Sequence, residues 1–537
     1  MEQVDHIVVG SGISGAHAAQ TLVEAGAKVL MLDVGNRDLK YADMIPDLNF
    51  LEIRKNDENQ HRYFLGDDFC GIPWGSTGVG AQLTPPRAFI SKDTEMWLRM
   101  DSGDFEPLES LARGGLGAGW GAGCFVFSKP ELEAIGLAQE GLTDAYNIAA
   151  GRIGVSGARD DGARYCVDGL NDIQGPIDID PQIADVYSMY KRKRKRLNDR
   201  GFYVGRSSLA LLTENLGDRR KTSYTDMEFW SDPGGSTYRA WMTVDALSKA
   251  RNFQYRDRVL VTRFSEEGGG VTVHAVNVDN GESVRFTCRK LIIASGVLGT
   301  ARIAIRSFGY RKERLPIISN PYCYVPCVRF KMLASTIPES KTSLAQLYIF
   351  YDRNHDNLDV GAASLFTYRS LLMFKLVKEV PLAQVDALRL MRFLLPSITI
   401  AGIFHPERGG SGKFVELVRD GGSPTGDRLR ASYRLSKEEQ NELRRMGRAY
   451  IGALMRLGCL PLKIIYPAHG SSIHYGGALP FSERDEPLTL SPGGRMNGTR
   501  SVFVADGSGF RYLPAKGITL TLMANAHLVA KRALENR

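Results

Sequence analysis

The fold is decided by the stretch Asp5-His6-Ile7-Val8-Val9-Gly10-Ser11-Gly12-Ile13-Ser14-Gly15, near the N-terminus of the chain. Its apolar first part predicts a short buried strand, and the alanine-rich residues 16–24 behind the glycines predict a helix. A second apolar strand follows at 28–32 and ends at Asp33. This order of a strand, a glycine turn, a helix, a second strand and an acidic residue is typical of a Rossmann-type βαβ unit. The sequence therefore predicts a unit that binds a dinucleotide.

Each glycine of this turn has its own task in such a unit. Gly10 makes the tight turn, Gly12 lets the backbone approach a pyrophosphate, and Gly15 lets the helix pack on the strand. The helix N-terminus at Ile13 and Ser14 supplies partial positive charge to the phosphates. Asp33 would accept hydrogen bonds from an adenosine ribose and would repel a 2′-phosphate, so FAD or NAD is favoured over NADP.

Length and composition set the frame around this unit. The chain has 537 residues, 43% of them apolar and 24% charged, which is typical of a soluble globular protein with at least two lobes. The net charge of +8 is small for this length, so we expect no nucleic-acid partner. The longest apolar stretches, such as 394–404, are shorter than the ~20 residues that cross a bilayer.

The first residues of the sequence and the cysteines predict a cytoplasmic protein. The first residues carry acids where a secretory signal needs basic residues. Seven scattered cysteines fit reduced thiols. Cys323 and Cys327 have no second pair or histidine cluster nearby, so we expect no metal site.

Three further glycine-containing elements are spread along the chain. Residues 114–123 are too rich in small side chains for a core helix or strand, so they must bring backbone very close to something flat or charged. Residues 290–302 repeat the plan of buried strand, small-residue turn and helix. Residues 501–509 predict a strand that meets an acid and glycines, and 519–534 predict a helix.

Together these elements resemble the glucose-methanol-choline family of FAD-dependent oxidoreductases, over both ends of the chain and residues 240–305. The resemblance makes NAD as sole cofactor the weaker option. It implies noncovalent FAD, because Gly119 stands where the sugar-oxidising branch has a histidine that bonds to the cofactor. The residues that we expect against FAD are Gly10, Gly12, Ile13, Ser14, Gly15, Asp33, Gly114, Gly115, Gly119, Trp120, Val261, Ala294, Ser295, Gly296, Asp506, Gly507, Ile518 and Thr519.

The expected fold class is α/β with an α+β substrate lobe. We expect a discontinuous Rossmann-like FAD-binding domain from residues 1–40, 100–130, 240–310 and 485–537. A substrate-binding domain with an antiparallel sheet and helices is expected from residues 131–239 and 311–484. Residues 41–99 form a lid or loop region, in which the glycine-rich loop 66–87 is flexible enough to be the lid.

The resemblance also implies a catalytic base. The sequence Ser472-Ile473-His474-Tyr475-Gly476-Gly477-Ala478 resembles the family signature of a catalytic histidine, and a neutral imidazole suits proton abstraction from an alcohol. The family's second histidine or asparagine is absent, because Gly517 occupies its place. Two interpretations of Lys516 stay open: its side chain reaches into the site, or it is solvated. We expect Trp120 and Tyr475 to contact the substrate, although core packing of Trp120 is nearly as well supported.

The predicted activity is oxidation of an alcohol group on a sugar, glycoside or polyol. Oxygen, a quinone or a protein could each accept the electrons. Two alternatives stay open: a lipid-linked or sterol-like alcohol taken at a membrane surface, and a flavin-binding partner protein without alcohol oxidation. The basic run 190–196 fits a solvated helix face best, with docking to an anionic partner, substrate or lipid headgroup as the alternative. Residues 370–396 suggest one or two helices in the substrate domain, or at a membrane surface.

Overall fold

The N-terminal stretch lies at the centre of a largely parallel sheet. The computed structural model describes residues 4–72, 83–101, 103–137, 140–225, 232–309, 314–336, 338, 342–367, 377 and 380–535. In it β1 (Val4–Val9) pairs in parallel with β2 (Val29–Leu32) and β8 (Ser283–Ile293). The remaining strands are β5 (Phe253–Arg256), β6 (Val259–Glu267), β7 (Gly270–Asn277) and β19 (Val502–Val504). The sheet order is β5-β2-β1-β8-β7-β6, with β19 paired to the carboxyl half of β8.

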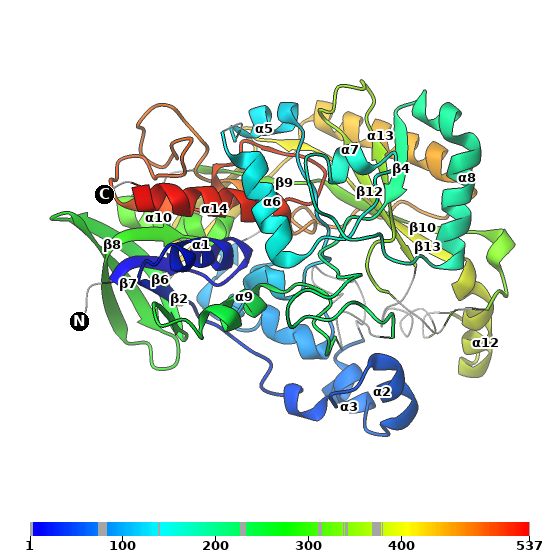
Figure 1. Ribbon diagram of the computed structural model, residues 1–537, viewed down its shortest axis with the longest axis horizontal. Coiled ribbons are helices and arrows are strands. Elements are labelled where there is room, and N and C mark those ends of the chain that lie inside the picture. The colour runs from blue at the N-terminus through cyan, green and yellow to red at the C-terminus, as the bar shows by residue number, and fades with distance from the viewer. Residues whose placement is uncertain are drawn as a thin grey trace.

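Helices from distant parts of the chain lie against this sheet (Figure 1). Helix α1 (Ile13–Glu24) contacts α9 (Ala240–Leu247) and α14 (Thr519–Glu535), and α10 (Val297–Phe308) contacts β6. The apolar side chains of β1, β2 and the end of β8 are buried, as expected of parallel strands with both faces covered. The first and last parts of the sequence therefore share one core.

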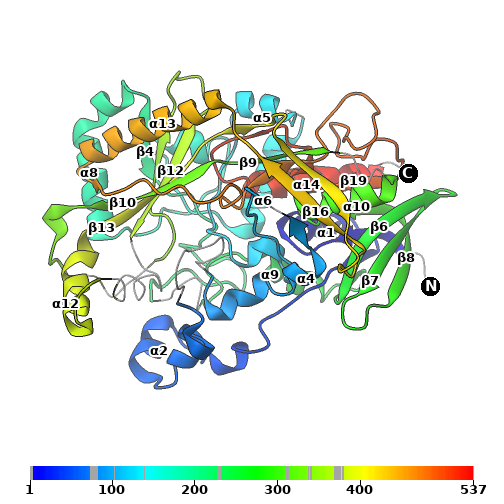
Figure 2. The same cartoon turned by 180° about the vertical axis from the view of Figure 1, so that it is seen from behind.

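An antiparallel sheet of six strands forms the other half of the molecule, in the order β17-β10-β13-β12-β11-β4. Its strands are β4 (Phe202–Arg206), β10 (Tyr322–Val328), β11 (Leu347–Tyr351), β12 (Gly361–Thr367), β13 (Ile398–Phe404) and β17 (Leu460–Pro461). Side chains from one face of this sheet share a buried cluster with α8 (Pro181–Asn198) and α13 (Lys437–Arg456). Figure 2 shows the two helices beside this sheet. The opposite face is left for the site described below.

Two smaller sheets lie between these halves. One has the order β18-β9-β15-β16-β3, and the other pairs β14 with β20. Their strands are β3 (Met100–Asp101), β9 (Leu315–Ser319), β14 (Glu407–Arg408), β15 (Lys413–Arg419), β16 (Asp427–Tyr433), β18 (Tyr475–Gly477) and β20 (Tyr512–Leu513).

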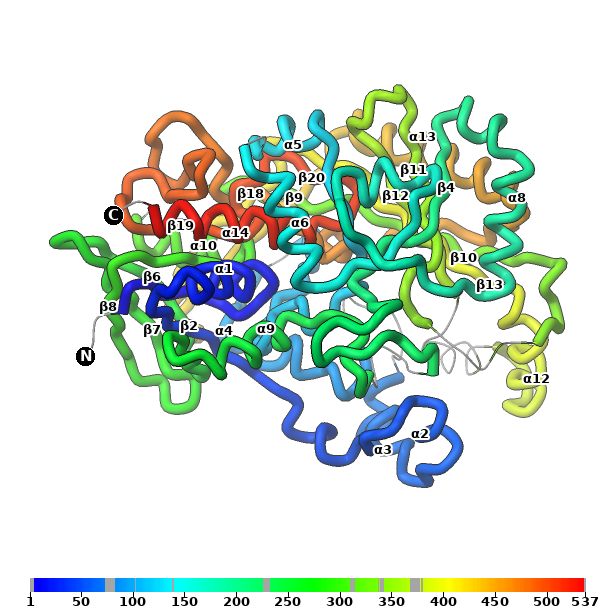
Figure 3. Tube along the Cα trace, viewed as in Figure 1, coloured from blue at the N-terminus to red at the C-terminus, as the bar shows by residue number. Residues whose placement is uncertain are grey.

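Short helices complete the chain, and the path of the backbone is clearest in Figure 3. The α-helices are α2 (Phe50–Asn56), α3 (His61–Phe64), α4 (Thr94–Trp97), α5 (Lys129–Ile135), α6 (Leu142–Ile153), α7 (Ala163–Cys166) and α12 (Gln384–Leu394). The 3₁₀ turns are η1 (Ala42–Met44), η2 (Asp67–Phe69), η3 (Pro85–Ile90), η4 (Gly115–Ala118), η5 (Phe330–Met332), η6 (Leu395–Ser397) and η7 (Gly507–Gly509). Both termini lie at one end of the molecule, and α8 and α12 lie at the other.

The structure confirms the mixed α/β class with an antiparallel sheet and helices. Of the expected lid 66–87, residues 73–82 lie outside the described residues, as do most of 368–379 in the expected helical region 370–396. All seven cysteines are free thiols. Within the described part of the chain, no helix is long and apolar enough to cross a membrane.

Candidate active site

A cavity of about 540 Å³ is lined by both halves of the molecule. It brings together the dinucleotide turn and His474, which the sequence separates widely. The predicted residues that line it are Gly10, Gly12, Ile13, Ser14, Asp33, Gly115, Gly119, Trp120, Val261, Ala294, Ser295, Gly296, His474, Tyr475, Asp506, Gly507, Gly517, Ile518 and Thr519. Gly15, Gly114 and Lys516 are not among the residues that line it.

The dinucleotide turn needs its glycines for distinct geometric reasons. A Cβ on Gly15 would lie 1.9 Å from the carbonyl oxygen of Gly10, so α1 would be pushed off β1. Gly10 has φ +93°, and a Cβ there would lie 2.7 Å from the carbonyl oxygen of Ala294. Gly12 is open toward the cavity, since its nearest neighbour would be Gly115 at 3.9 Å. Gly15 therefore acts through packing, while Gly12 presents backbone to the cavity.

Asp33 at the end of β2 is held by two hydroxyl groups. Ser11 Oγ donates a hydrogen bond to its carboxylate, and Tyr255 Oη donates another over 3.0 Å. Burial raises the pKa of Asp33 to about 6. Ser11 Oγ also accepts from the Gly114 N–H over 2.8 Å, which ties the second glycine cluster to the dinucleotide turn. Gly114 thus supports the site from outside the cavity.

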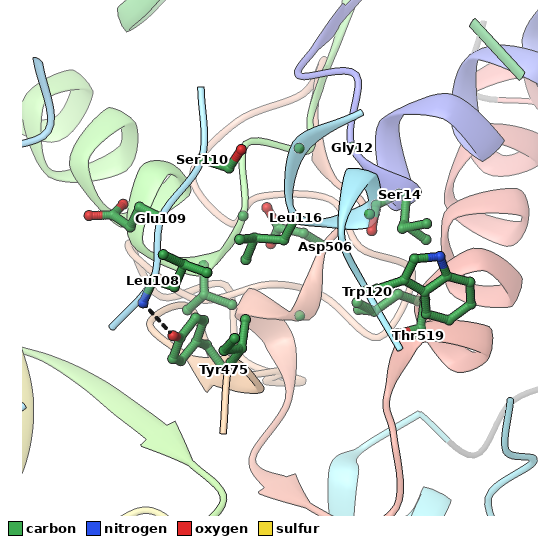
Figure 4. A pocket seen from close by; sticks show the side chains of 18 of the residues that line it. Gly12, Ser14, Leu108, Glu109, Ser110, Leu116, Trp120, Tyr475, Asp506 and Thr519 are labelled. Atoms are coloured by element: carbon green, nitrogen blue, oxygen red, sulfur yellow. Dashed lines mark hydrogen bonds between the residues drawn. The ribbon is translucent and has the colours of Figure 1, made fainter. Parts of the chain in front are cut away.

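Asp506 closes the cavity near the start of α10. Its carboxylate accepts hydrogen bonds from Thr300 Oγ1 over 2.6 Å and from the Ser508 N–H over 3.0 Å. Figure 4 shows Asp506 within the cavity lining, together with Gly12, Ser14, Trp120 and Thr519. Because the carboxylate is committed to these donors, it fixes the turn that presents the Gly507 backbone to the cavity.

Trp120 and Tyr475 line the cavity, and their polar atoms already form hydrogen bonds with the protein backbone. Trp120 Nε1 donates to the Tyr238 carbonyl over 2.8 Å. Tyr475 Oη accepts from the Leu108 N–H over 2.8 Å (dashed in Figure 4) and donates to the Gly470 carbonyl over 2.9 Å. The predicted substrate contacts of these two residues are therefore limited to their rings.

The six-stranded antiparallel sheet supplies one wall of the cavity. Register pairs Tyr348 with Ser364, and Ala362 with Phe404, so these side chains and Phe366 project from one face. All five line the cavity. Tyr348 is 6% exposed, and its hydroxyl forms no hydrogen bond with the residues described. Burial raises its pKa well above the usual value, so the phenol stays protonated and can donate.

His474 is half-buried, and its hydrogen bonds define its tautomer. Its ring stacks on Phe404 with centroids 5.2 Å apart. Nδ1 lies 3.1 Å from Asn320 Oδ1, while Asn320 Nδ2 faces the carbonyl oxygens of His405, Leu513 and Pro514. Because Nδ2 must be the donor, Oδ1 accepts, and Nδ1 of His474 carries the proton. Nε2 is then left as a bare acceptor.

Burial also lowers the pKa of His474 to about 4. The imidazole is therefore neutral throughout the physiological range, and its Nε2 can take a proton. Asn320 was missed by the sequence interpretation because it lies in the turn between β9 and β10, far from His474 in the chain and in no motif.

Gly517 lines the cavity at the place where the resemblance expects a histidine or asparagine. A Cβ there would lie 3.1 Å from two ring atoms of Phe125. Phe125 lines the cavity and makes an edge contact with Tyr348, with centroids 4.8 Å apart. An aromatic ring thus fills the space of the missing polar side chain.

Lys516 fits neither of the two interpretations. Its ammonium pairs with Glu131 at 2.6 Å, and Nζ also donates to the Val126 carbonyl over 3.2 Å. Both side chains are almost completely buried, so the lysine is not solvated. The ion pair draws the ammonium toward the N-terminal turn of α5, where Glu131 also completes a capping box with Ser128. Lys516 therefore ties Gly517 to α5 and is not among the cavity-lining residues.

We looked for metal ligands among the described residues as well. Among the described residues, no group of three or more His, Cys, Asp or Glu side chains is arranged to hold a metal ion.

Comparison with known proteins shows a shared fold. The structure is similar to the crystal structure of pyridoxine 4-oxidase from Mesorbium loti, with a TM-score of 0.57 over 99% of each chain. The two sequences are 13% identical over this match. No protein-family model matches the sequence, and no curated protein matches it.

Proposed function

We propose that the protein is an FAD-dependent oxidoreductase of the glucose-methanol-choline type that acts on a CH–OH group. The observation that carries this proposal is the continuity of one cavity from the dinucleotide turn to a half-buried, neutral His474. A dinucleotide end and a proton acceptor are the two parts that oxidation of an alcohol requires. The shared fold with an oxidase is consistent with this assignment.

The chain's residues fit FAD at the dinucleotide end. Gly12 leaves an open backbone surface beside the N-terminus of α1, which suits a pyrophosphate. Asp33 stands at the end of β2, where a ribose would bind, and Val261 lines the cavity from β6. We expect noncovalent binding, because the cavity presents Gly119 where a covalent link would need a histidine. FAD supplies the acceptor for the hydride that leaves the alcohol carbon.

His474 is the proposed base. With Nδ1 occupied by Asn320, Nε2 is the atom that would accept the hydroxyl proton of the substrate. Asn320 prevents ring rotation and keeps this tautomer, while stacking on Phe404 fixes the ring plane. With Phe125 beside Gly517, the described site provides one histidine and no second proton-handling group at that position.

The side chains of the wall favour a substrate whose hydroxyl group is carried by an uncharged aromatic or apolar molecule. Trp120, Phe125, Phe366 and Phe404 offer ring surfaces, and Tyr348 offers one free donor. A sugar or polyol presents many hydroxyl groups and needs more hydrogen-bonding partners than this part of the lining provides. The sugar expected from the resemblance is therefore the less favoured substrate. The structural neighbour, named as an oxidase of pyridoxine, acts on an alcohol carried by a flat ring, which supports the same class.

The test is anaerobic mixing of the FAD-reconstituted protein with alcohols of each class: pyridoxine, benzyl alcohols, sugars and sterols. Loss of the oxidised flavin absorbance with a ring alcohol is the expected result. His474→Ala should keep the flavin spectrum and slow reduction by the ~10²–10⁴-fold that positioned proton transfer supplies. A protein that stays colourless with FAD and binds NAD tightly would overturn the cofactor proposal. Flavin that binds but is reduced by no alcohol would favour a flavin-binding partner protein.

A further inference from the structure

The end of the molecule opposite the termini carries an unusual surface, which we call the distal end. It comprises α8, α12, η5, β17 and the last turn of α13. Figures 1 and 2, which view the molecule from opposite sides, agree in placing α8 and α12 at this end. None of these elements contributes a residue to the cavity lining.

Direct contacts join the elements of the distal end. Lys193 Nζ on α8 donates to the Arg456 carbonyl at the end of α13 over 2.7 Å. Arg329, beside η5, pairs with Asp185 on α8 and donates to the Leu457 carbonyl over 2.8 Å. Two backbone links continue the surface. Strand β17 pairs with the end of β10 next to η5, and the Ala334 N–H donates to the Phe393 carbonyl of α12 over 3.0 Å.

Cations crowd the α8 side of the distal end. Lys195, Arg196 and Arg200 are exposed, and no described carboxylate forms an ion pair with them. Arg456 lies close to the two arginines: burial, followed by the charges of Arg200 and Arg196, lowers its pKa. Among the described residues, Asp199 is the one carboxylate in the hollow that Arg192, Lys193, Lys195, Arg196 and Arg200 line, so the positive charge there is only partly offset. An anionic surface would relieve the remaining repulsion between these cations.

Apolar side chains are exposed on the α12 side. Eight of the fifteen exposed large apolar side chains in the described part of the chain come from the distal end, the lead-in to α12 and the residue after β17. The most exposed are Phe330 at 65% and Leu462 at 61%. The others are Leu382, Val385, Leu388, Phe393, Met455 and Leu460. So many exposed apolar groups at one end mark an interaction site, not a solvated face.

We propose that the distal end docks on a bilayer that contains anionic lipids. Cations would meet the headgroups, and Phe330, Phe393 and Leu462 would enter the boundary between headgroups and acyl chains. A basic cluster and an apolar group together supply the two signals that stable peripheral binding requires. Nucleic acid would use the cations alone and leave the apolar side chains in water. The proposal is independent of the function proposed for the cavity.

The experiment is sedimentation of the full-length protein with vesicles of phosphatidylcholine alone, or of phosphatidylcholine with phosphatidylglycerol. We expect binding to the mixed vesicles that falls steeply as salt rises, and little binding to phosphatidylcholine. Replacing Lys195, Arg196 and Arg200 by Glu should weaken partition by about tenfold or more. Replacing Phe330, Phe393 and Leu462 by Ser should also weaken it and leave a residual binding that salt abolishes.

The matched control reverses the same number of charges at the opposite end of the molecule. Arg263, Arg285 and Arg289 are exposed on β6 and β8. Their replacement by Glu should leave vesicle binding within about twofold, with far-ultraviolet circular dichroism confirming that each variant is folded. The proposal would be overturned by equal binding to both vesicle types. It would also be overturned if the control variant lost vesicle binding to the same extent, or if the protein bound RNA but not vesicles.

Discussion

The two ends of the cavity are built by different means. The dinucleotide end is mostly backbone from short glycine-containing turns, in which Gly10 and Gly15 are needed because neighbouring main-chain atoms leave no room for a Cβ. The alcohol end is made of side chains that β11, β12, β13 and the segment around His474 bring from separate parts of the chain. A site built from backbone should lose ligand binding when a single Cβ atom is added to one of its glycines. A site built from side chains should keep its fold after a substitution and change its reaction rate or pH dependence.

Gly15→Ala tests the backbone-built end and should have the largest effect. The added Cβ would lie 1.9 Å from the Gly10 carbonyl oxygen, so α1 and β1 must separate. We expect loss of cofactor binding and a drop of more than about 4 kcal/mol in the free energy of unfolding. Chemical denaturation and flavin fluorescence measure both. The control is Gly151→Ala in α6, where nothing lies within 4 Å of the new Cβ. Similar losses in both variants would contradict the geometric argument.

Lys516→Met tests the junction between the two ends. Removing the ammonium leaves the buried Glu131 carboxylate without its partner, which should lower the free energy of unfolding by about 3 kcal/mol. Adding Glu131→Gln removes the stranded charge and should restore much of the stability. If Lys516→Met instead leaves the free energy of unfolding unchanged and slows only flavin reduction, the lysine acts on the substrate. Its ion pair with Glu131 would then not contribute to stability.

Asn320→Asp tests the side-chain-built end without removing its base. The unaltered protein should keep its reduction rate down to about pH 4, because burial holds the His474 pKa there. A carboxylate at position 320 would favour the imidazolium, so the acid limb should move up by about one to three pH units. The pH profile of anaerobic reduction measures this shift. A slower rate with an unmoved acid limb would show that Asn320 does not set the state of His474.

Tyr348→Phe should have the smallest effect. The phenol is buried, protonated and without a partner in the described chain, so its removal should leave stability unchanged. A substrate that accepts its hydrogen bond should lose about 0.5–1.5 kcal/mol of binding, or roughly two- to tenfold in KM. A matched substrate without the accepting group should show no change between the two proteins. An equal change for both substrates would argue for a packing role.

The same contrast explains what could be predicted from the sequence. The strand before Gly10, the helix after the glycine turn and the helix over 519–534 are local patterns, and the structure confirms these expected elements. An antiparallel sheet was expected, and the structure confirms it. Which of its side chains form the wall was not predictable, because Leu347–Tyr351 has both faces covered and shows no alternation of polar and apolar residues.

The direction in which individual side chains point could not be predicted from the sequence either. The sequence left open whether Lys516 reaches into the site or is solvated, and a carboxylate on α5, distant in the chain, decides where its ammonium lies. Asn320 and Phe125 carry no motif, since their roles arise from packing against segments far away in the sequence. The roles of His474 and of the expected FAD contacts stay predictions that the experiments above address.

The position of β1 in its sheet has a consequence for how the protein is made. One edge of β1 pairs with β2, which follows within a few dozen residues, but the other pairs with β8. At about 5–20 residues per second, β8 leaves the ribosome roughly 15–60 s after β1. Throughout that interval the growing chain exposes an apolar strand edge, the feature that invites pairing with other nascent chains. The segments between β1 and β8 therefore lengthen the period in which the unfinished protein depends on chaperones.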